Sequence, residues 1–190
     1  MARSRIHPLA ALRRFARARR GATAVEFALV ALPFVMLLFG IMELAAVFLA
    51  SATLDLATDR AARLIRTGEF QTSGATSKSA FKSEVCSRMS WLSGACNSNL
   101  IVDVQTFANF TDAANAGQPT ADQFKNNTTC FTTGTAGDIV LVRAYYTWTL
   151  TTPLLDGALD NTGDGKRRIM AIATFRNEPY SSDIPVGAAC

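Results

Sequence analysis

The chain has 190 residues, of which 49% are hydrophobic, and its formal net charge is +4. This length suffices for one folded domain with an appended segment, but not comfortably for two domains. The positive charge is confined to the N-terminus, where residues 1–21 contain seven arginines and no acid; the rest of the chain has a net charge of −3. Because only this tail is basic, the composition argues against a nucleic-acid-binding fold, and we expect no nucleic-acid partner.

An apolar run of membrane length follows the basic tail. Residues 27–50 form a stretch of 24 residues in which Glu43 is the single charged residue. A transmembrane helix needs about 20 apolar residues, and arginines before such a run hold the N-terminus in the cytoplasm. We therefore expect a basic cytoplasmic leader over 1–21, a lipid-contacting transmembrane helix over 22–50, and a periplasmic domain over 51–190. This arrangement is typical of a single-pass protein of the bacterial inner membrane.

The helical pattern continues beyond the apolar run. Apolar side chains recur there at helical spacing, at Leu54, Ala57, Ala61, Leu64 and Ile65. Pro33 lies inside the run and should bend the helix, and Gly68 favours its end. We therefore predict one helix from about residue 23 to 67, whose outer part over 51–67 packs on a soluble core.

The remaining elements change from helical to strand periodicity. Residues 79–92 predict a short second helix. Alternating apolar and polar residues then predict half-buried strands near 100–105, 140–150 and 169–176. Residues 108–137 are rich in Asn, Thr, Ala and Gly and predict a long loop, with an extra strand as an option near Thr129–Thr132. The predicted fold class is α+β, with a long N-terminal helix, a short second helix and an antiparallel sheet of three or four strands.

All four cysteines follow the apolar run, at Cys86, Cys96, Cys130 and Cys190. An even number in an oxidising compartment indicates two disulfides, for which three connectivities are open. The spacing favours Cys86–Cys96 and Cys130–Cys190, and four reduced thiols are the less favoured alternative. A zinc site is not indicated, because no C-x-x-C occurs and the one histidine, His7, precedes the membrane segment. We expect no metal and no cofactor.

An acid stands at the start of the apolar run, in the stretch RRGATAVEFALVALPF. A carboxylate costs roughly 2.5–3.5 kcal/mol at the centre of a membrane helix and less near its end, so Glu26 alone could simply reach the headgroups. Together with Gly21 and the arginines before it, however, the stretch resembles the processing site of type IV prepilins. This resemblance implies that a membrane-bound prepilin peptidase cuts between Gly21 and Ala22. Glu26 would then be the fifth residue, and it would pair with the new amine of a neighbouring subunit.

The longer stretch GATAVEFALVALPFVMLLFGIMELA resembles the TadE-like family, the minor pilins or pseudopilins of the Tad tight-adherence pilus system. The stretches DRAARLIRTGEF and FRNEPY (residues 175–180) are also similar to family motifs. The resemblance implies a pilin-like domain without catalytic residues and a role in pilus assembly, initiation or adhesion. Its implied partners are other Tad minor pilins, the inner-membrane Tad platform and, as a further candidate, the major pilin. The subunit could enter a surface pilus.

Two other acidic features have alternative interpretations. Glu43 lies 17 residues after Glu26, about 100° away around a helix, so the two acids do not share a face. It could reach the outer headgroups or contact a partner helix. The stretch DNTGDG (Asp160–Gly165) resembles the start of a calcium loop, but Ala171 stands where an EF-hand needs an acid. A turn between two strands is the favoured interpretation.

Two other function classes compete with the pilin hypothesis. An anchored enzyme is disfavoured because the predicted periplasmic part contains no histidine and its acids are scattered. A membrane-anchored or secreted binding module with no pilus role is the second alternative. Secretion would need cleavage after Ala52, in the small-residue stretch ASA, but the helical pattern runs through this position.

Overall fold

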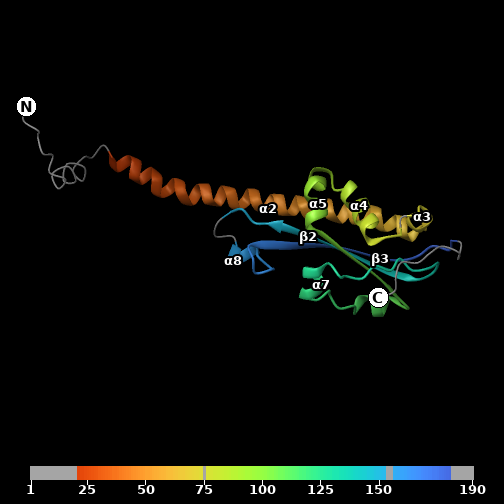
Figure 1. Cartoon of the computed structure of the whole chain (residues 1–190). Helices are drawn as coiled ribbons and strands as arrows, with labels where there is room; N and C mark the ends of the chain where they lie inside the picture. The colour runs from red at the N-terminus through yellow and green to blue at the C-terminus, as the bar shows by residue number, and fades with distance from the viewer. Residues whose placement is uncertain (1–20, 75, 153–155, 181–190) are drawn as a thin grey trace, which may run out of the picture. The chain divides into compact units, whose positions relative to one another are not determined.

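The computed structural model describes residues 21–74, 76–152 and 156–180. By its internal contacts the chain divides into two compact units, of which the first ends at Glu43 and the second begins at Leu44. The helix α2 (Ala22–Arg66) contributes to both units (Figure 1). Pro33 lies inside α2. The long helix predicted from the sequence is confirmed within one residue at each end.

The second unit contains the outer part of α2, further short helices and one sheet. The helical elements are α3 (Glu69–Thr72), α4 (Lys78–Ser87), the 3-10 turn η2 (Ser90–Leu92), α5 (Ser93–Asn99), α6 (Phe110–Ala114), α7 (Ala121–Asn126) and α8 (Asp156–Leu159). The strands are β1 (Leu100–Phe107), β2 (Ile139–Thr149) and β3 (Lys166–Arg176). They form an antiparallel sheet in the order β1-β2-β3. The predicted α+β class is confirmed.

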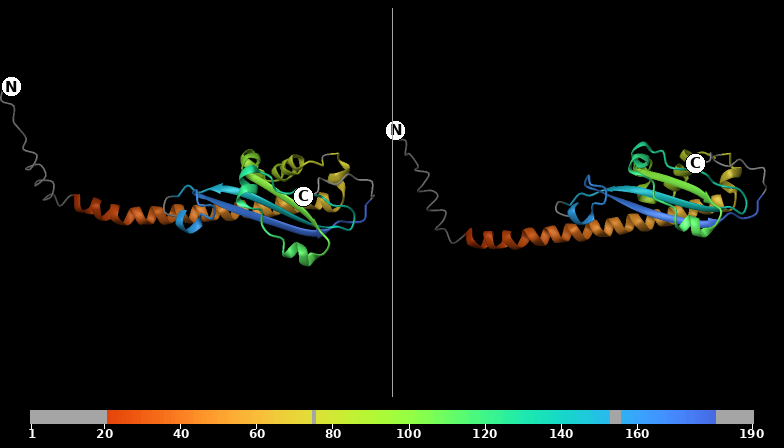
Figure 2. Two further views of the ribbon diagram at one scale, coloured as in Figure 1. Left: turned by 60° about the horizontal axis from the view of Figure 1, so that its bottom comes forward. Right: turned by 90° about the horizontal axis from the view of Figure 1, so that it is seen from below.

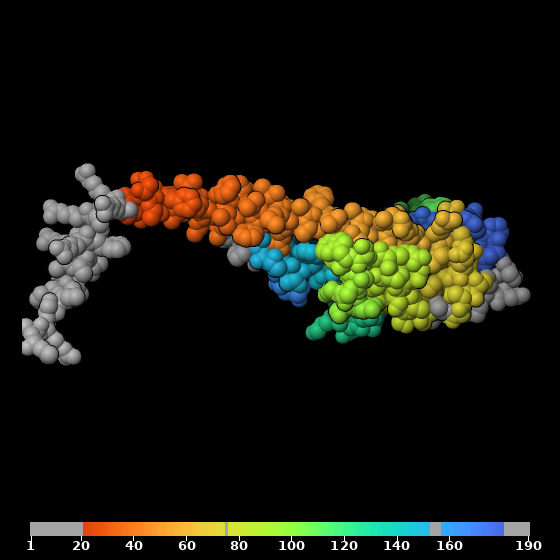
Figure 3. Space-filling model, turned by 90° about the horizontal axis from the view of Figure 1, so that it is seen from above, coloured from red at the N-terminus to blue at the C-terminus, as the bar shows by residue number. Residues whose placement is uncertain are grey.

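One face of the sheet packs on the outer part of α2. The α2 residues of this core are fully or almost fully buried: Leu54, Ala57, Ala61 and Ile65. These four side chains belong to one hydrophobic core cluster that also contains residues of all three strands. Figure 2 shows α2 running along the sheet, and Figure 3 shows the segment from α3 to α5 packed beside it. The predicted packing of residues 51–67 is therefore confirmed.

The opposite face of the sheet is also covered over β2, which the sequence did not predict, whereas Met170 and Ile172 of β3 are exposed. The segment between β1 and β2, including α7, lies on this side (Figure 1). Phe124 of α7 contacts Tyr145 of β2 edge to face, with 4.8 Å between the ring centroids. As a result the first eight residues of β2 are buried on both faces. The prediction of a half-buried strand is wrong for this central strand.

Three further boundaries differ from the prediction. The second helix ends at Ser87 instead of residue 92, because the chain turns through Ser90, whose φ is +48°, before α5 begins. The predicted long loop contains α6 and α7, which begin at the side-chain caps of Asn109 and Thr120. The optional fourth strand is only an isolated parallel bridge between Val104 and Phe131.

β3 is an edge strand whose outer side is closed only at its start. The side chain of Asn161 accepts a hydrogen bond from the Arg168 amide at 2.7 Å and donates one to its carbonyl at 3.0 Å. Every second residue of an antiparallel strand turns its backbone groups to the same side. Met170, Ile172 and Thr174 therefore present theirs away from β2, and no hydrogen bond reaches these outer groups within the part of the chain described. This stretch is an open sheet edge.

Candidate functional site

The predicted cleavage bond lies at the start of α2. Gly21 immediately precedes the helix, which begins at Ala22, and both residues are exposed. A Cβ added to Gly21 would meet no heavy atom within 4 Å. A peptidase could therefore approach this bond without displacing another described part of the chain. The residues before Gly21 lie outside the described range, so cleavage itself stays a prediction.

Glu26 lies one turn after this bond. Residues four apart in a helix share a face, and side chains lean toward the N-terminus. The exposed Glu26 carboxylate therefore points back toward the position where cleavage would create an amine on Ala22. The arrangement can hold a positive amine, either from the same chain or from a neighbouring one.

The surface around Glu26 is apolar on all sides of α2. Phe27 is 75% exposed, and large exposed apolar side chains continue along the helix at Leu29, Val30, Leu32, Phe34, Leu37, Phe39, Ile41 and Phe48. The helix is long and apolar enough to cross a membrane, and none of its most apolar 18-residue window is buried. A helix apolar all round must be covered by lipid or by other helices. This fits a single-pass membrane anchor.

Glu43, the second acid in the run, differs from Glu26 in its environment. It is only 6% exposed, whereas the neighbouring Met42 is 58% exposed. Glu43 also has a polar partner in the structure. A contact with a partner helix would have to expose or exchange this carboxylate, and such a role stays a prediction.

The FRNEPY motif closes the other end of α2. Gly68 ends the helix with a φ of +79°, and its amide donates to the carbonyl of Ile65. The Glu178 amide donates to the carbonyl of Arg66 at 2.9 Å, and the two side chains form an exposed ion pair at 3.1 Å. The motif therefore ties the C-terminal segment to the last turn of the helix.

Tyr180 and Asn177 complete this closure. The Tyr180 hydroxyl accepts hydrogen bonds from the side chains of Gln71 at 3.2 Å and Asn177 at 2.9 Å. The Asn177 amide group also donates to the carbonyls of Thr133 and Thr135, both at 3.0 Å. A Cβ at Gly68 would lie 2.8 Å from the Tyr180 ring. The close approach and the left-handed backbone both require glycine at this position, and the motif acts as a structural lock.

The comparison with known families decides the character of the N-terminal segment. Residues 21–63 match the family model described as TadE-like protein. This segment is similar to the TadE-like family. The resemblance recognised in the sequence is thereby confirmed over the helix, and the match begins at Gly21, beside the predicted cleavage bond. No curated protein and no solved structure matches the chain.

Beyond the TadE-like segment, a disulfide links two of the four cysteines. Cys86 of α4 and Cys96 of α5 are bonded, with their Cα atoms 5.5 Å apart. This bond holds α5 against α4. The residues of α5 by themselves carry only a weak helical signal. The first predicted pair is confirmed. The second predicted pair includes Cys190, which lies outside the described residues.

The DNTGDG stretch forms a turn held by its own first residue. The Asp160 carboxylate accepts hydrogen bonds from the amides of Thr162, Gly163 and Gly165 at 2.7–2.9 Å. These amides lower the pKa of Asp160 from its usual 3.8 to about 2. Lys166 pairs with Asp164 at 2.5 Å. The carboxylates are thus already partnered, which supports the turn interpretation over a calcium loop.

A buried ion pair outside the TadE-like segment was not recognised in the sequence. Asp103 of β1 lies opposite Arg143 of β2 in the sheet, and their side chains are 1% and 4% exposed. Arg143 donates to one carboxylate oxygen through Nε at 2.9 Å and Nη2 at 2.6 Å. Its Nη1 donates to the Gly117 carbonyl at 2.7 Å, while Asp103 accepts from the Cys130 amide at 2.9 Å. The pair joins both strands to the segment that covers them.

Proposed function

We propose that this chain is a minor pilin of a Tad-type pilus, cleaved between Gly21 and Ala22 by a prepilin peptidase. The main supporting observation is that the TadE-like match begins at Gly21 and that Glu26, the first acid of the matched segment, lies near the start of an exposed apolar helix. Cleavage removes every arginine of the basic leader. Since those charges hold the helix at the cytoplasmic face, their loss permits extraction of the subunit into a filament.

Glu26 then acts in assembly. After cleavage, the Ala22 amine and the Glu26 carboxylate of one chain share a helix face and can neutralise each other. In a bundle of such helices, the same two groups from neighbouring subunits can pair at similar depth. A buried pair of this kind adds little net stability, because desolvation offsets the attraction, but it fixes the axial register of one helix against the next. Glu26 is therefore proposed as a register-setting residue.

The second unit is proposed to be a non-enzymatic assembly domain in the periplasm. Its partners would be other Tad minor pilins, the inner-membrane platform and the major pilin. In this domain the central strand β2 is buried on both faces over its first eight residues, and FRNEPY is bonded to the end of α2. A membrane-anchored binding module with no pilus role is the alternative; that role would leave the leader uncut.

The test is the intact mass of the protein isolated from its native membranes. Loss of residues 1–21 supports the proposal, whereas a full-length chain or loss through Ala52 refutes it. Gly21→Ala should retain the leader. Glu26→Gln should be cleaved yet reduce piliation, while the matched control Glu69→Gln, which removes an exposed acid beyond α2, should leave piliation unchanged. Normal piliation by both Gly21→Ala and Glu26→Gln would refute the proposed minor-pilin function.

A further inference from the structure

A pocket opens within the second unit where β3 begins beside α2. Its volume is about 270 Å³. The side formed by α2 comprises Leu44, Val47, Phe48 and Ser51, and the side formed by β3 includes Arg167 and Met170. One wall is therefore mostly apolar, and polar groups stand beside it. None of the features assigned above to processing, assembly or the α2 lock uses this pocket.

The position of the pocket along α2 places it at a membrane surface. The apolar run, in which Glu43 is the single charged residue, begins at Phe27, and Val47 follows 20 residues later. At 1.5 Å per residue this is about 30 Å of helix, which equals the thickness of the hydrocarbon core, about 30 Å. If the run spans the bilayer, the α2 side of the pocket lies where the outer acyl chains meet their headgroups.

The pocket also carries a positive charge that no acid neutralises. Nη1 of Arg167 donates to the Leu159 carbonyl at 2.9 Å, and the ion pairs among the described residues do not include Arg167. Its other guanidinium N–H groups make no hydrogen bond in this part of the chain. The Ser51 hydroxyl likewise makes none there. An oxyanion in the pocket would thus meet several free donors.

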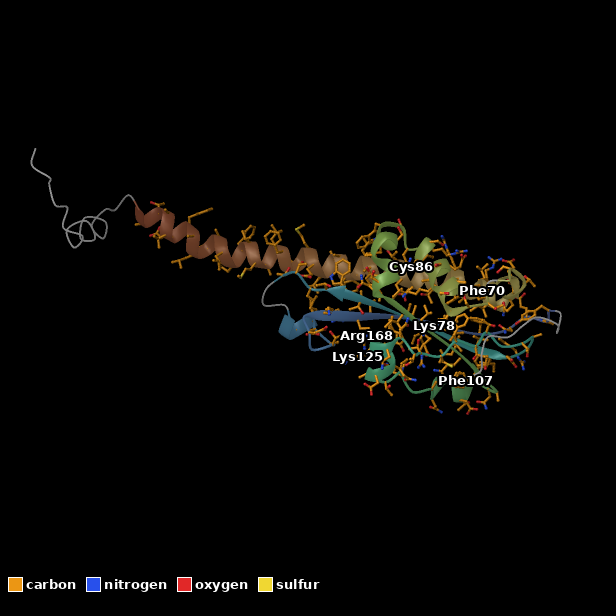
Figure 4. All side chains as sticks on the ribbon, in the orientation of Figure 1. Phe70, Lys78, Cys86, Phe107, Lys125 and Arg168 are labelled. Atoms are coloured by element: carbon orange, nitrogen blue, oxygen red, sulfur yellow. A yellow bond between two sulfur atoms is a disulfide. The ribbon has the colours of Figure 1, made fainter. Side chains whose placement is uncertain are left out.

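Arg168 does not share this role. Successive strand residues face opposite sides of a sheet, and the Arg168 guanidinium lies over the Phe124 ring, with its central carbon 3.8 Å from the centroid. Figure 4 shows Arg168 on the side where α7 and Lys125 lie. Arg168 is also among the lining residues, but its charge is engaged with Phe124. Arg167 is the charge that serves the pocket.

We propose that this pocket binds the headgroup of an anionic phospholipid from the outer leaflet. The Arg167 guanidinium contacts the phosphate, Ser51 donates to the same group, and the acyl chains lie along Leu44 and the exposed Phe48. The volume lies just below the usual range of about 300–1,000 Å³ for pockets that enclose a whole ligand, which suits a headgroup whose chains remain in the bilayer. A free anion would not need the apolar wall. The inference rests on the membrane-spanning part of the proposed function, and not on cleavage at Gly21.

Binding can be measured on the full chain in nanodiscs of phosphatidylcholine with and without phosphatidylglycerol. After mild detergent extraction, native mass spectrometry counts the phosphatidylglycerol retained per chain. Arg167→Gln should lower its affinity about tenfold or more, since it removes a charge-assisted hydrogen bond, and Ser51→Ala should lower it less. The matched control Arg60→Gln removes one positive charge from the exposed surface of α2, beyond the pocket, and should retain the lipid as the unmodified chain does.

Three results would overturn the inference: no preference for phosphatidylglycerol in the unmodified chain, equal retention by Arg167→Gln and Arg60→Gln, or displacement of the lipid by inorganic phosphate alone. The last result would identify a site for a free anion. The thermal midpoint of each variant checks that the fold is intact, and Ser51→Ala still tests the pocket if Arg167→Gln unfolds. Lipid retention in nanodiscs, combined with a full-length mass for the protein isolated from its native membranes, would leave this inference standing while refuting the pilin proposal.

Discussion

Replacing Arg143 by methionine tests the energetic role of the buried ion pair. The substitution keeps an unbranched apolar stem and removes the guanidinium. The Asp103 carboxylate, which is 1% exposed, would lose both of its bonds to Arg143. It would keep the Cys130 amide at 2.9 Å and the Gln105 side chain at 3.1 Å. The result is a buried charge with incomplete compensation.

The expected loss in the free energy of unfolding is about 3–5 kcal/mol, the usual cost of removing one partner from a buried pair. Since whole domains have only about 5–15 kcal/mol, Arg143→Met should shift the urea midpoint strongly. The matched control is Arg88→Met, because Arg88 pairs with Glu84 on α4 and both side chains are about 30% exposed. A pair as accessible as this contributes about 1 kcal/mol or less.

Tryptophan fluorescence during urea unfolding provides the assay. The chain has two tryptophans, Trp91 and Trp148, and their rings meet edge to face within the second unit, 6.0 Å apart. The signal therefore reports on this unit. The double variant Asp103→Leu with Arg143→Met should lose less than the sum of the two single variants, since no charge is stranded. An Arg143→Met cost no larger than that of Arg88→Met, or strict additivity, would refute the reasoning.

Three further outcomes can be checked on the same protein. Gly68→Ala should cost at least about 1–2 kcal/mol by urea unfolding, because alanine disfavours the left-handed backbone; the control Gly94→Ala, which has open space, should cost nothing, and equal effects would contradict the lock. Replacing Cys86 and Cys96 by serine should cost about 2–3 kcal/mol, as expected for a short closed loop, and an unchanged urea midpoint would contradict this. The Asp160 carboxyl should titrate in an NMR experiment near its lowered pKa of about 2, so its contribution to stability is complete above about pH 4 and is lost as pH falls toward 2; titration near 3.8 would contradict the turn geometry.

The sequence predicted the elements whose signals are long and periodic. α2 was predicted almost to the residue, because a charge-free run, an alanine-rich stripe and Gly68 all agree. The three strands were predicted from simple alternation. The sheet order was not, since alternation shows which residues share a face and does not show which strands pair.

The features that the sequence did not predict depend mostly on tertiary contacts. Asp103 and Arg143 occupy alternate strand positions that indicate a solvent-facing side, and only the fold shows that the segment between β1 and β2 covers them. Their opposite charges at polar strand positions were the one available signal. α5 lacks a strong apolar period, and the disulfide at Cys96 holds it in place. The caps Asn109-x-x-Asp112 and Thr120-x-x-Gln123 could have revealed α6 and α7.

The open edge of β3 has a consequence for how copies of this chain can meet. Exposed edges are templates for sheet extension, and proteins protect them with charge. Ile172, 52% exposed, lies at the middle of the open stretch. If two copies joined antiparallel about Ile172, Arg168 of one would stand opposite Arg176 of the other, which is unfavourable for like charges. The two arginines therefore disfavour pairing of this edge with the same edge of a second copy in this register. A strand with acidic ends would meet no such repulsion.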